Sequence, residues 1–108
     1  MKDIIFFSSG VIQYLDNPYS FLKKISNFEI PIIALTRNNF SNKYKPIVQK
    51  YTFFEKDYFI VNSPLKKKDL IKIFLNAGYS KLLDTPERDN TGAYPNWNYG
   101  GNLVFIKK

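Results

Sequence analysis

Four short apolar blocks along the chain predict β-strands, at residues 3–8, 30–35, 79–84 and 102–107. In the first block, Ile4, Ile5, Phe6 and Phe7 leave no polar position, a pattern typical of a strand buried on both faces beneath helices. The second block has the same pattern. A helical segment between the two predicts a strand–helix–strand unit, and therefore a parallel pair of strands.

Two amphipathic segments between the strands predict helices. Asn17 is the expected N-cap of the first helix, because the next residue, Pro18, suits the first helical position. The second helix is expected to begin near Pro64 with Ser63 as its cap, and to end at Gly78 in the left-handed conformation. Its expected apolar stripe is Leu65, Leu70, Ile71, Phe74 and Leu75.

The remaining segments predict a loop, a hairpin and a closing strand pair. Residues 36–40 are expected to form a polar loop after the second strand, and the β-branched and aromatic residues that follow predict an inserted hairpin with strands 47–54 and 58–61. A long polar segment before the last strand suits an antiparallel finish. No linker divides the chain, so we expect a single domain over residues 1–108.

The composition excludes several kinds of chemistry. The 108-residue chain has no cysteine and no histidine, so no disulfide, no thiolate nucleophile and no site built on these metal ligands is expected. We predict no metal site, and no residue has the pattern of a proton-transfer catalyst, so catalytic residues stay unassigned. No apolar run is long enough for a signal-peptide core or a membrane span, so we expect a soluble, cytoplasmic protein.

The net charge of +7 permits two interpretations. A basic chain can bind nucleic acid or another anionic polymer. The 16 lysines and arginines are scattered along the sequence, which is instead typical of a solvated surface in a lysine-rich proteome. A non-enzymatic basic binding module therefore stays an alternative to the function considered next.

Several segments together resemble one protein family. Residues 3–9 (DIIFFSS) followed by 13–18 (QYLDNP) are similar to the segment after the fourth strand of class I S-adenosylmethionine-dependent methyltransferases. They resemble in particular a methyltransferase family associated with bacterial surface-polysaccharide genes. Residues 36–40 (TRNNF), 47–50 (IVQK) and 101–108 (GNLVFIKK) fit the same family, so the resemblance extends over nearly the whole chain.

The resemblance implies an α/β fold, namely half of a Rossmann-like methyltransferase sheet. The strands would follow the order 4-5-7-6 with the last strand antiparallel, two main helices and an inserted hairpin. The glycine-rich turn that holds the cofactor belongs to the N-terminal half of the family fold, and residues 1–108 contain no Gly-x-Gly element ahead of a helix. We therefore expect a partial domain, from a truncated gene product, a split enzyme or an excised fragment, which is inactive alone.

The resemblance also implies where the site lies. Ser8 and Ser9 would flank the methionine end of S-adenosylmethionine, and Gln13 and Tyr14 would lie beside the methyl acceptor. The simpler alternative is that the two serines end a strand and cap a turn. The cofactor is expected for the complete enzyme and not for this chain alone.

Arg37 is the candidate contact for an anionic or carboxylate group of the substrate, because a guanidinium binds such groups with two hydrogen bonds. Asn38 next to it is a second candidate substrate residue. A solvated loop arginine and a turn-forming asparagine are the alternatives. A further aromatic cluster that could stack on a base or a sugar, or pack its loop onto the sheet, comprises Tyr94, Trp97 and Tyr99, with Arg88 nearby.

The expected partners follow from the missing half. They are an N-terminal methyltransferase half, or a second copy paired across the edge of the first strand, because bare apolar edges pair or aggregate. A small molecule or a glycan is the expected acceptor, and nucleic acid is not expected. Which molecule accepts the methyl group, and whether the chain is active, stay open.

Overall fold

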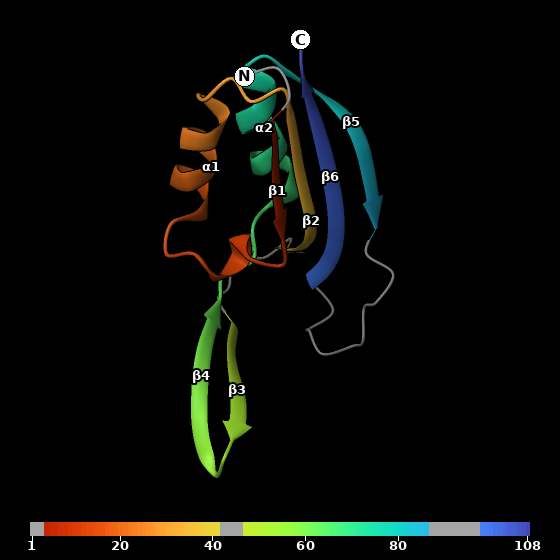
Figure 1. The fold of residues 1–108 in the computed structure, drawn as a ribbon. Helices are drawn as coiled ribbons and strands as arrows, with labels where there is room; N and C mark the ends of the chain where they lie inside the picture. Colours follow the sequence, from red (N-terminus) through yellow and green to blue (C-terminus); the bar gives the residue numbers. More distant parts are fainter. Residues whose placement is uncertain (1–3, 42–46, 87–97) are drawn as a thin grey trace.

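The computed structural model describes residues 4–41, 47–86 and 98–108, and its elements follow the predicted order (Figure 1). The elements are β1 (Ile5–Ser9), the 3-10 turn η1 (Ile12–Tyr14), α1 (Pro18–Ser26), β2 (Ile32–Ser41), β3 (Ile47–Phe53), β4 (Lys56–Asn62), α2 (Lys67–Asn76), β5 (Tyr79–Pro86) and β6 (Asn98–Lys107). No helix of the described part is long and apolar enough to cross a membrane.

The main sheet has four strands in the order β1-β2-β6-β5. β1 pairs with β2 in parallel, whereas β6 is antiparallel to both of its neighbours, β2 and β5. This arrangement confirms the predicted α/β fold, with its 4-5-7-6 strand order and a reversed last strand. Apolar residues that are direct register partners, such as Phe6, Ile33 and Phe105, form a continuous row across β1, β2 and β6.

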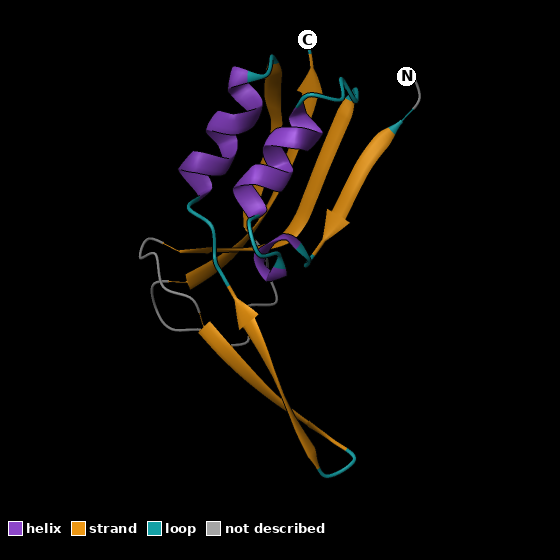
Figure 2. Ribbon diagram, turned by 90° about the vertical axis from the view of Figure 1, so that its left-hand side faces the viewer, coloured by secondary structure: helices purple, strands orange, loops and turns teal. Residues whose placement is uncertain are grey.

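The core lies between this sheet and the two helices, which cover the same face of it (Figure 2). The ring of Phe74 from α2 stacks on Phe105 with centroids 4.7 Å apart and meets Tyr79 edge-on at 5.6 Å. The fully buried members of the cluster include Leu22, Ile33, Leu35, Phe40, Leu65, Leu70, Phe74, Leu103 and Phe105. Large aromatic and branched side chains thus fill the space between two layers, as expected for an α/β unit.

The opposite face of the sheet has no covering layer among the described residues (Figure 2). We call it the open face; by strand register it comprises Ile5, Phe7, Ile32, Ala34, Leu83, Val104 and Ile106. Ile5 is 59% and Phe7 65% exposed, so the prediction that the first strand is buried on both faces is wrong for this chain. The physical reason is that helices lie on one side and that β1 is an edge strand.

The helix boundaries are partly as predicted. The Oδ1 atom of Asn17 accepts a hydrogen bond from the backbone N–H of Ser20 at 3.2 Å, and Gly78 has a φ of +92° just after α2, which confirms the expected cap and terminator. The expected start of the second helix near Pro64 is wrong. Residue Leu65 is instead extended and pairs beside Phe40, so α2 begins at Lys67.

The predicted stripe of that helix is also wrong at two positions, because Leu65 precedes the helix and Leu75 lies on its outer side. Leu70 and Phe74 are buried and Ile71 is partly buried, whereas Leu75 is half-exposed. Ile73 takes part in the packing in its place. With α2 beginning three residues later than expected, its inward face follows the positions that meet β5 and β6.

The hairpin β3–β4 is confirmed and projects away from the sheet and helices (Figure 1). The two strands pair from Ile47 and Asn62 at the base to Phe53 and Lys56 at the far end. The two residues of the turn, Phe54 and Glu55, both have positive φ, at 51° and 63°. Positive φ at both central positions defines a type I′ turn, whose twist matches that of paired strands.

Candidate functional site

The carboxyl ends of the parallel strands β1 and β2 lie side by side. Ser8 pairs in register with Leu35 and Ser9 with Thr36, and the N–H of Gly10 donates to the Thr36 carbonyl at 3.0 Å. Ligands of open α/β sheets bind outside the carboxyl ends of the strands. This edge of the sheet is therefore the candidate site, and it contains each of the predicted substrate and cofactor residues.

The segment 36–40, predicted as a polar loop, is instead part of a strand, so that prediction is wrong. β2 continues to Ser41 because residues 38–41 pair with 98–101 of β6. The register shifts between Leu35 and Asn38, and this bulge takes up the residues that the sequence suggests as a loop.

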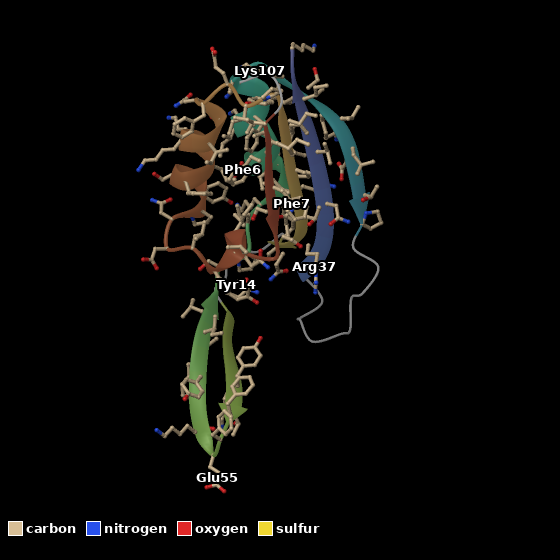
Figure 3. The ribbon with its side chains drawn as sticks, in the orientation of Figure 1. Phe6, Phe7, Tyr14, Arg37, Glu55 and Lys107 are labelled. Carbon is tan, nitrogen blue, oxygen red and sulfur yellow. The ribbon has the colours of Figure 1, made fainter. Side chains whose placement is uncertain are left out.

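Arg37 lies in the bulge with a φ of 54°, a left-handed conformation that costs a non-glycine residue about 1 kcal/mol or more. Its backbone is held from two sides. The N–H of Arg37 donates to Oδ1 of Asn102 at 2.8 Å, and its carbonyl accepts from Nε2 of Gln13 at 3.4 Å. The side chain is exposed, beside the lower end of β6 (Figure 3). Strain held by the surroundings at such an edge is typical of functional positions.

Gln13 is 4% exposed and links three parts of the structure. It lies on η1, its side chain donates to the Arg37 carbonyl, and its backbone carbonyl accepts from the N–H of Ser63 at 2.7 Å. The residue after it, Tyr14, is half-buried and lies at the root of the hairpin (Figure 3). Gln13 thus positions both the bulge at Arg37 and the chain that leaves β4.

Asn38 is buried and stabilises the bulge. Its Nδ2 donates to the carbonyl of Leu35 at 2.8 Å and to that of Gly101 at 3.1 Å, so it joins β2 to itself and to β6. A turn-forming role in a loop, the simpler interpretation of its sequence, does not apply, because the residue is inside a strand pairing.

The structure adds two buried amides that the sequence did not single out. Nδ2 of Asn39 donates to Oδ1 of Asn62 at 3.1 Å, which ties the base of the hairpin to β2. Both side chains are buried, although asparagine is a residue that sequence reasoning assigns to turns. The amide cluster therefore consists of Gln13, Asn38, Asn39 and Asn62.

Three atoms of this amide cluster have no hydrogen-bond partner among the described residues: Oε1 of Gln13, Oδ1 of Asn38 and Nδ2 of Asn62. An unpaired buried polar group costs about 1–3 kcal/mol. Two acceptors and one donor therefore lie unpaired, without charge, beneath the candidate site. Such groups are uncommon in folded proteins.

The ionisable groups with altered pKa values belong to the packing of the body. Burial raises the pKa of Asp84, but the hydrogen bonds and charges of Lys67 and Lys81 outweigh that effect and lower it below its ordinary value. The ion pair between Asp84 and Lys67 joins β5 to α2. The Nζ atom of Lys81, which is also on β5, lies 3.0 Å from Oδ2 of Asp84. Burial, and to a smaller extent the charge of Glu29, raises the pKa of Tyr79.

Among the described residues, neither a metal site nor the groove between the two helices lies at this edge. Within residues 4–41, 47–86 and 98–108, no group of three or more acidic side chains could hold a metal ion. A groove of about 300 Å³ lies between α1 and α2, where its lining includes Ser26, Asn27, Asn76 and Ala77. These residues directly precede β2 and β5, so the groove is at the other end of the sheet from the candidate site.

Part of the predicted aromatic cluster cannot be placed. Arg88, Tyr94 and Trp97 lie outside the described residues. Tyr99 is described by its backbone, which pairs in β6 opposite Phe40.

Solved structures share this fold, although no protein-family model and no curated protein sequence matches the chain. A S-adenosylmethionine-dependent methyltransferase from Clostridium acetobutylicum ATCC 824 aligns over 98% of this chain with a TM-score of 0.57 and 12% identity. A Listeria monocytogenes protein assigned to the same methyltransferases aligns over 96%, with a TM-score of 0.56 and 10% identity. The glycopeptide N-methyltransferase MtfA in complex with sinefungin aligns over 96%, with a TM-score of 0.51 and 12% identity.

The chain therefore has the α/β fold of class I S-adenosylmethionine-dependent methyltransferases over the part of it that these structures match. At 10–12% identity the likeness establishes the fold and not the reaction. The chain spans 58%, 61% and 57% of the length of the three structures.

Proposed function

We propose that this chain is the C-terminal, acceptor-side part of a S-adenosylmethionine-dependent methyltransferase, and that it needs a partner for the cofactor side. The observation that carries the proposal is the open face beside a bare edge strand. Ile5 and Phe7 of β1 are more than half exposed there, although they belong to an apolar block suited to burial. In a matching structure, of which this chain covers 58%, the remaining part supplies a reason for that exposure.

The cofactor would supply an electrophilic methyl group, and the protein would mainly align the acceptor with it. Alignment of this kind accounts for a large share of the rate in group transfer, so the lack of histidine does not count against the reaction. In the proposal Ser8 and Ser9 lie at the methionine end of the cofactor. Arg37 binds an anionic group of the acceptor, and Gln13 holds the Arg37 backbone in place.

The acceptor is proposed to be a small molecule or a glycan. The resemblance of residues 3–18 to a family associated with bacterial surface-polysaccharide genes supports this. The partner is proposed to be an N-terminal methyltransferase half, with a second copy of the chain as the other candidate for the β1 edge.

Titration calorimetry with S-adenosylmethionine tests the function. We expect no heat of binding for the chain alone, and binding once the polypeptide encoded directly upstream of Met1 is added. Binding by the chain alone would show that the proposed division of the site is wrong. Failure of every upstream-encoded segment to restore binding would count against a methyltransferase.

Light scattering after size-exclusion chromatography at micromolar concentration tests the open face. We expect the chain to self-associate or to bind its partner through β1 and the open face, and the Ile5→Lys, Phe7→Lys variant to be monomeric. Val48→Lys, at an equally exposed apolar position of the hairpin, is the matched control and should associate normally. A wild-type chain that is a clean monomer and ignores the partner would contradict the proposal.

The alternative, a basic module for nucleic acid or anionic polymer, stays a prediction. It requires binding that weakens steeply as salt is raised, because such binding depends on counterion release. Nucleic-acid binding with no salt dependence would remove it.

A further inference from the structure

We propose that one face of the β3–β4 hairpin binds an aromatic ring carried by the methyl acceptor; this inference rests on the function proposed above. The aromatic face, defined by strand register, consists of Tyr51 and Phe53 on β3 with Tyr58 and Ile60 on β4. Their side chains are between 38% and 57% exposed. An aromatic surface of this kind on a projecting element marks a contact site, because isolated apolar residues and not clusters are usual at a surface.

The rings of this face are already ordered against one another. The planes of Tyr51 and Phe53 are within 15° of parallel with centroids 6.4 Å apart, and Phe53 meets Tyr58 at 6.3 Å and 55°. Aromatic rings bind further rings in offset-stacked or edge-to-face geometry, with centroids about 4.5–7 Å apart. A ligand ring bound on this face can therefore stack on one of these rings and meet another edge-to-face.

The charge and hydrogen-bonding groups of the hairpin favour an uncharged ring over a sugar. Its charged residues, Lys50, Glu55, Lys56 and Asp57, sum to zero. On the other face, Asp57 forms an ion pair with Lys50 at 3.5 Å and accepts a hydrogen bond from Thr52 at 2.9 Å. Among the side chains that the structure describes, the aromatic face offers the hydroxyls of two tyrosines and one lysine, too few fixed groups to satisfy the many hydroxyls of a sugar.

The size of the aromatic face argues against a second copy as its occupant. At about 150–250 Å² for each aromatic side chain, residues exposed to this degree present on the order of 350 Å². Stable dimers bury about 800 Å² on each partner. The face is therefore about half of what self-association needs, but it matches the area of a single ring-bearing ligand.

The hairpin also starts and ends at the candidate site. Asn62, its last residue, is bonded to Asn39 of β2, and the next residue, Ser63, donates to Gln13. Figure 3 shows Tyr14 at the root of the hairpin, Arg37 beside the lower end of β6, and Glu55 at the far end of the hairpin. An acceptor held by Arg37 at the sheet edge and by the hairpin through its ring would contact two elements that share Gln13 as their support.

Amide chemical shifts of the isotope-labelled chain test this proposal with three probes. They are benzyl alcohol, cyclohexylmethanol, which has the same size without an aromatic ring, and methyl β-D-glucopyranoside. We expect benzyl alcohol, titrated in the millimolar range, to shift the signals of residues 51–60. The other two probes should bind more weakly by about 2- to 12-fold, the factor that ring pairing adds beyond buried area.

Paired variants locate the binding. The double variant Tyr51→Leu, Tyr58→Leu keeps apolar area and removes two rings. It should lower the affinity for benzyl alcohol by about 2- to 12-fold, the same factor as for the probes without a ring. Phe59→Leu, on the other face, should leave it unchanged. Unshifted signals of β1 and β2 confirm that the body stays folded. If the double variant loses its hairpin signals, the comparison of the three probes on the wild-type chain decides alone.

Several results would overturn the proposal. They are equal binding of cyclohexylmethanol, tighter binding of the glucoside, shifts that map elsewhere, and an equal loss in Phe59→Leu. Hairpin signals that change with protein concentration in the absence of a probe would assign the face to a second copy instead. Each of these results leaves the calorimetric test of cofactor binding untouched, so the two proposals can fail separately.

Discussion

The two faces of the main sheet contain equally apolar residues but differ in how these are packed. On the covered face, Phe74 is in ring contact with Phe105 and Tyr79, and α2 is joined to β5 by an ion pair. On the open face, Ile5 and Phe7 are largely exposed. The difference teaches that an apolar pattern does not by itself decide burial, because the described helices cover only one of the two faces.

The largest expected effect is on the covered face. Phe74→Ala should lower the free energy of unfolding by about 3–5 kcal/mol, because it removes a fully buried ring and leaves a cavity. Phe7→Ala on the open face is the matched control and should change it by less than about 0.5 kcal/mol. Urea denaturation measures both. Equal losses would mean that the open face is already buried in the free chain.

A smaller loss is expected where β2 and β6 approach each other closely. A Cβ atom at Gly101 would lie 2.9 Å from Cε2 of Phe40, whose ring is fully buried and cannot move away. Gly101→Ala should therefore cost about 1–3 kcal/mol, as overpacked cores do. Ser80→Ala, on the uncovered side of β5, should be close to neutral in the same denaturation experiment. A neutral Gly101→Ala would contradict the packing described for the core.

At the candidate site, a substitution should raise the free energy of unfolding, whereas those in the core lower it. Arg37→Gly relieves a positive φ and should raise the free energy of unfolding by about 1 kcal/mol, while it removes the proposed contact with the acceptor. Thr36→Gly, without a positive φ, should instead lower it by about 0.5–1 kcal/mol. Thermal unfolding distinguishes the two variants. Equal destabilisation by both glycines would exclude strain at Arg37.

The smallest expected effect depends on pH. Because the folded chain lowers the pKa of Asp84, its ion pairs stabilise the fold above the ordinary pKa of an aspartate and lose this contribution as the pH falls through the lowered value. At pH 7 the free energy of unfolding of the wild type should exceed that of Asp84→Asn by less than about 1 kcal/mol, since the ion pairs are partly exposed. The difference should vanish in acid. A difference that stays constant from neutral to acid pH would refute this.

The strands could be predicted from the sequence because their signals are local. The apolar blocks and the caps at Asn17 and Gly78 are each set by neighbouring residues, and they fixed the strand order once the family resemblance was added. The start of α2 was missed for a tertiary reason. Ser63 and Pro64 form a plausible helix start, but pairing of Leu65 with β2 takes that segment into an extended conformation.

The location of the candidate site could be predicted from the sequence, but the buried hydrogen bonds beneath it could not. Strand ends identified the edge that holds Ser8, Ser9 and Arg37. The burial of Gln13 and Asn38 depends on partners 24 and 63 residues away, and no local pattern records such contacts. Asparagines are assigned to turns for the same reason, although here they close hydrogen bonds inside the sheet.

The turn of the hairpin has a consequence for proteolysis. Phe54 is 97% exposed at the far end of an element whose two strands have no further strand beside them in the described part of the chain. Among the described aromatic residues, Phe54 should therefore be the first after which a protease specific for such residues cleaves, and this cut divides the 108 residues into two fragments of equal length. Because β2 and β6 lie on different fragments and remain paired, the nicked protein should stay together until it is denatured.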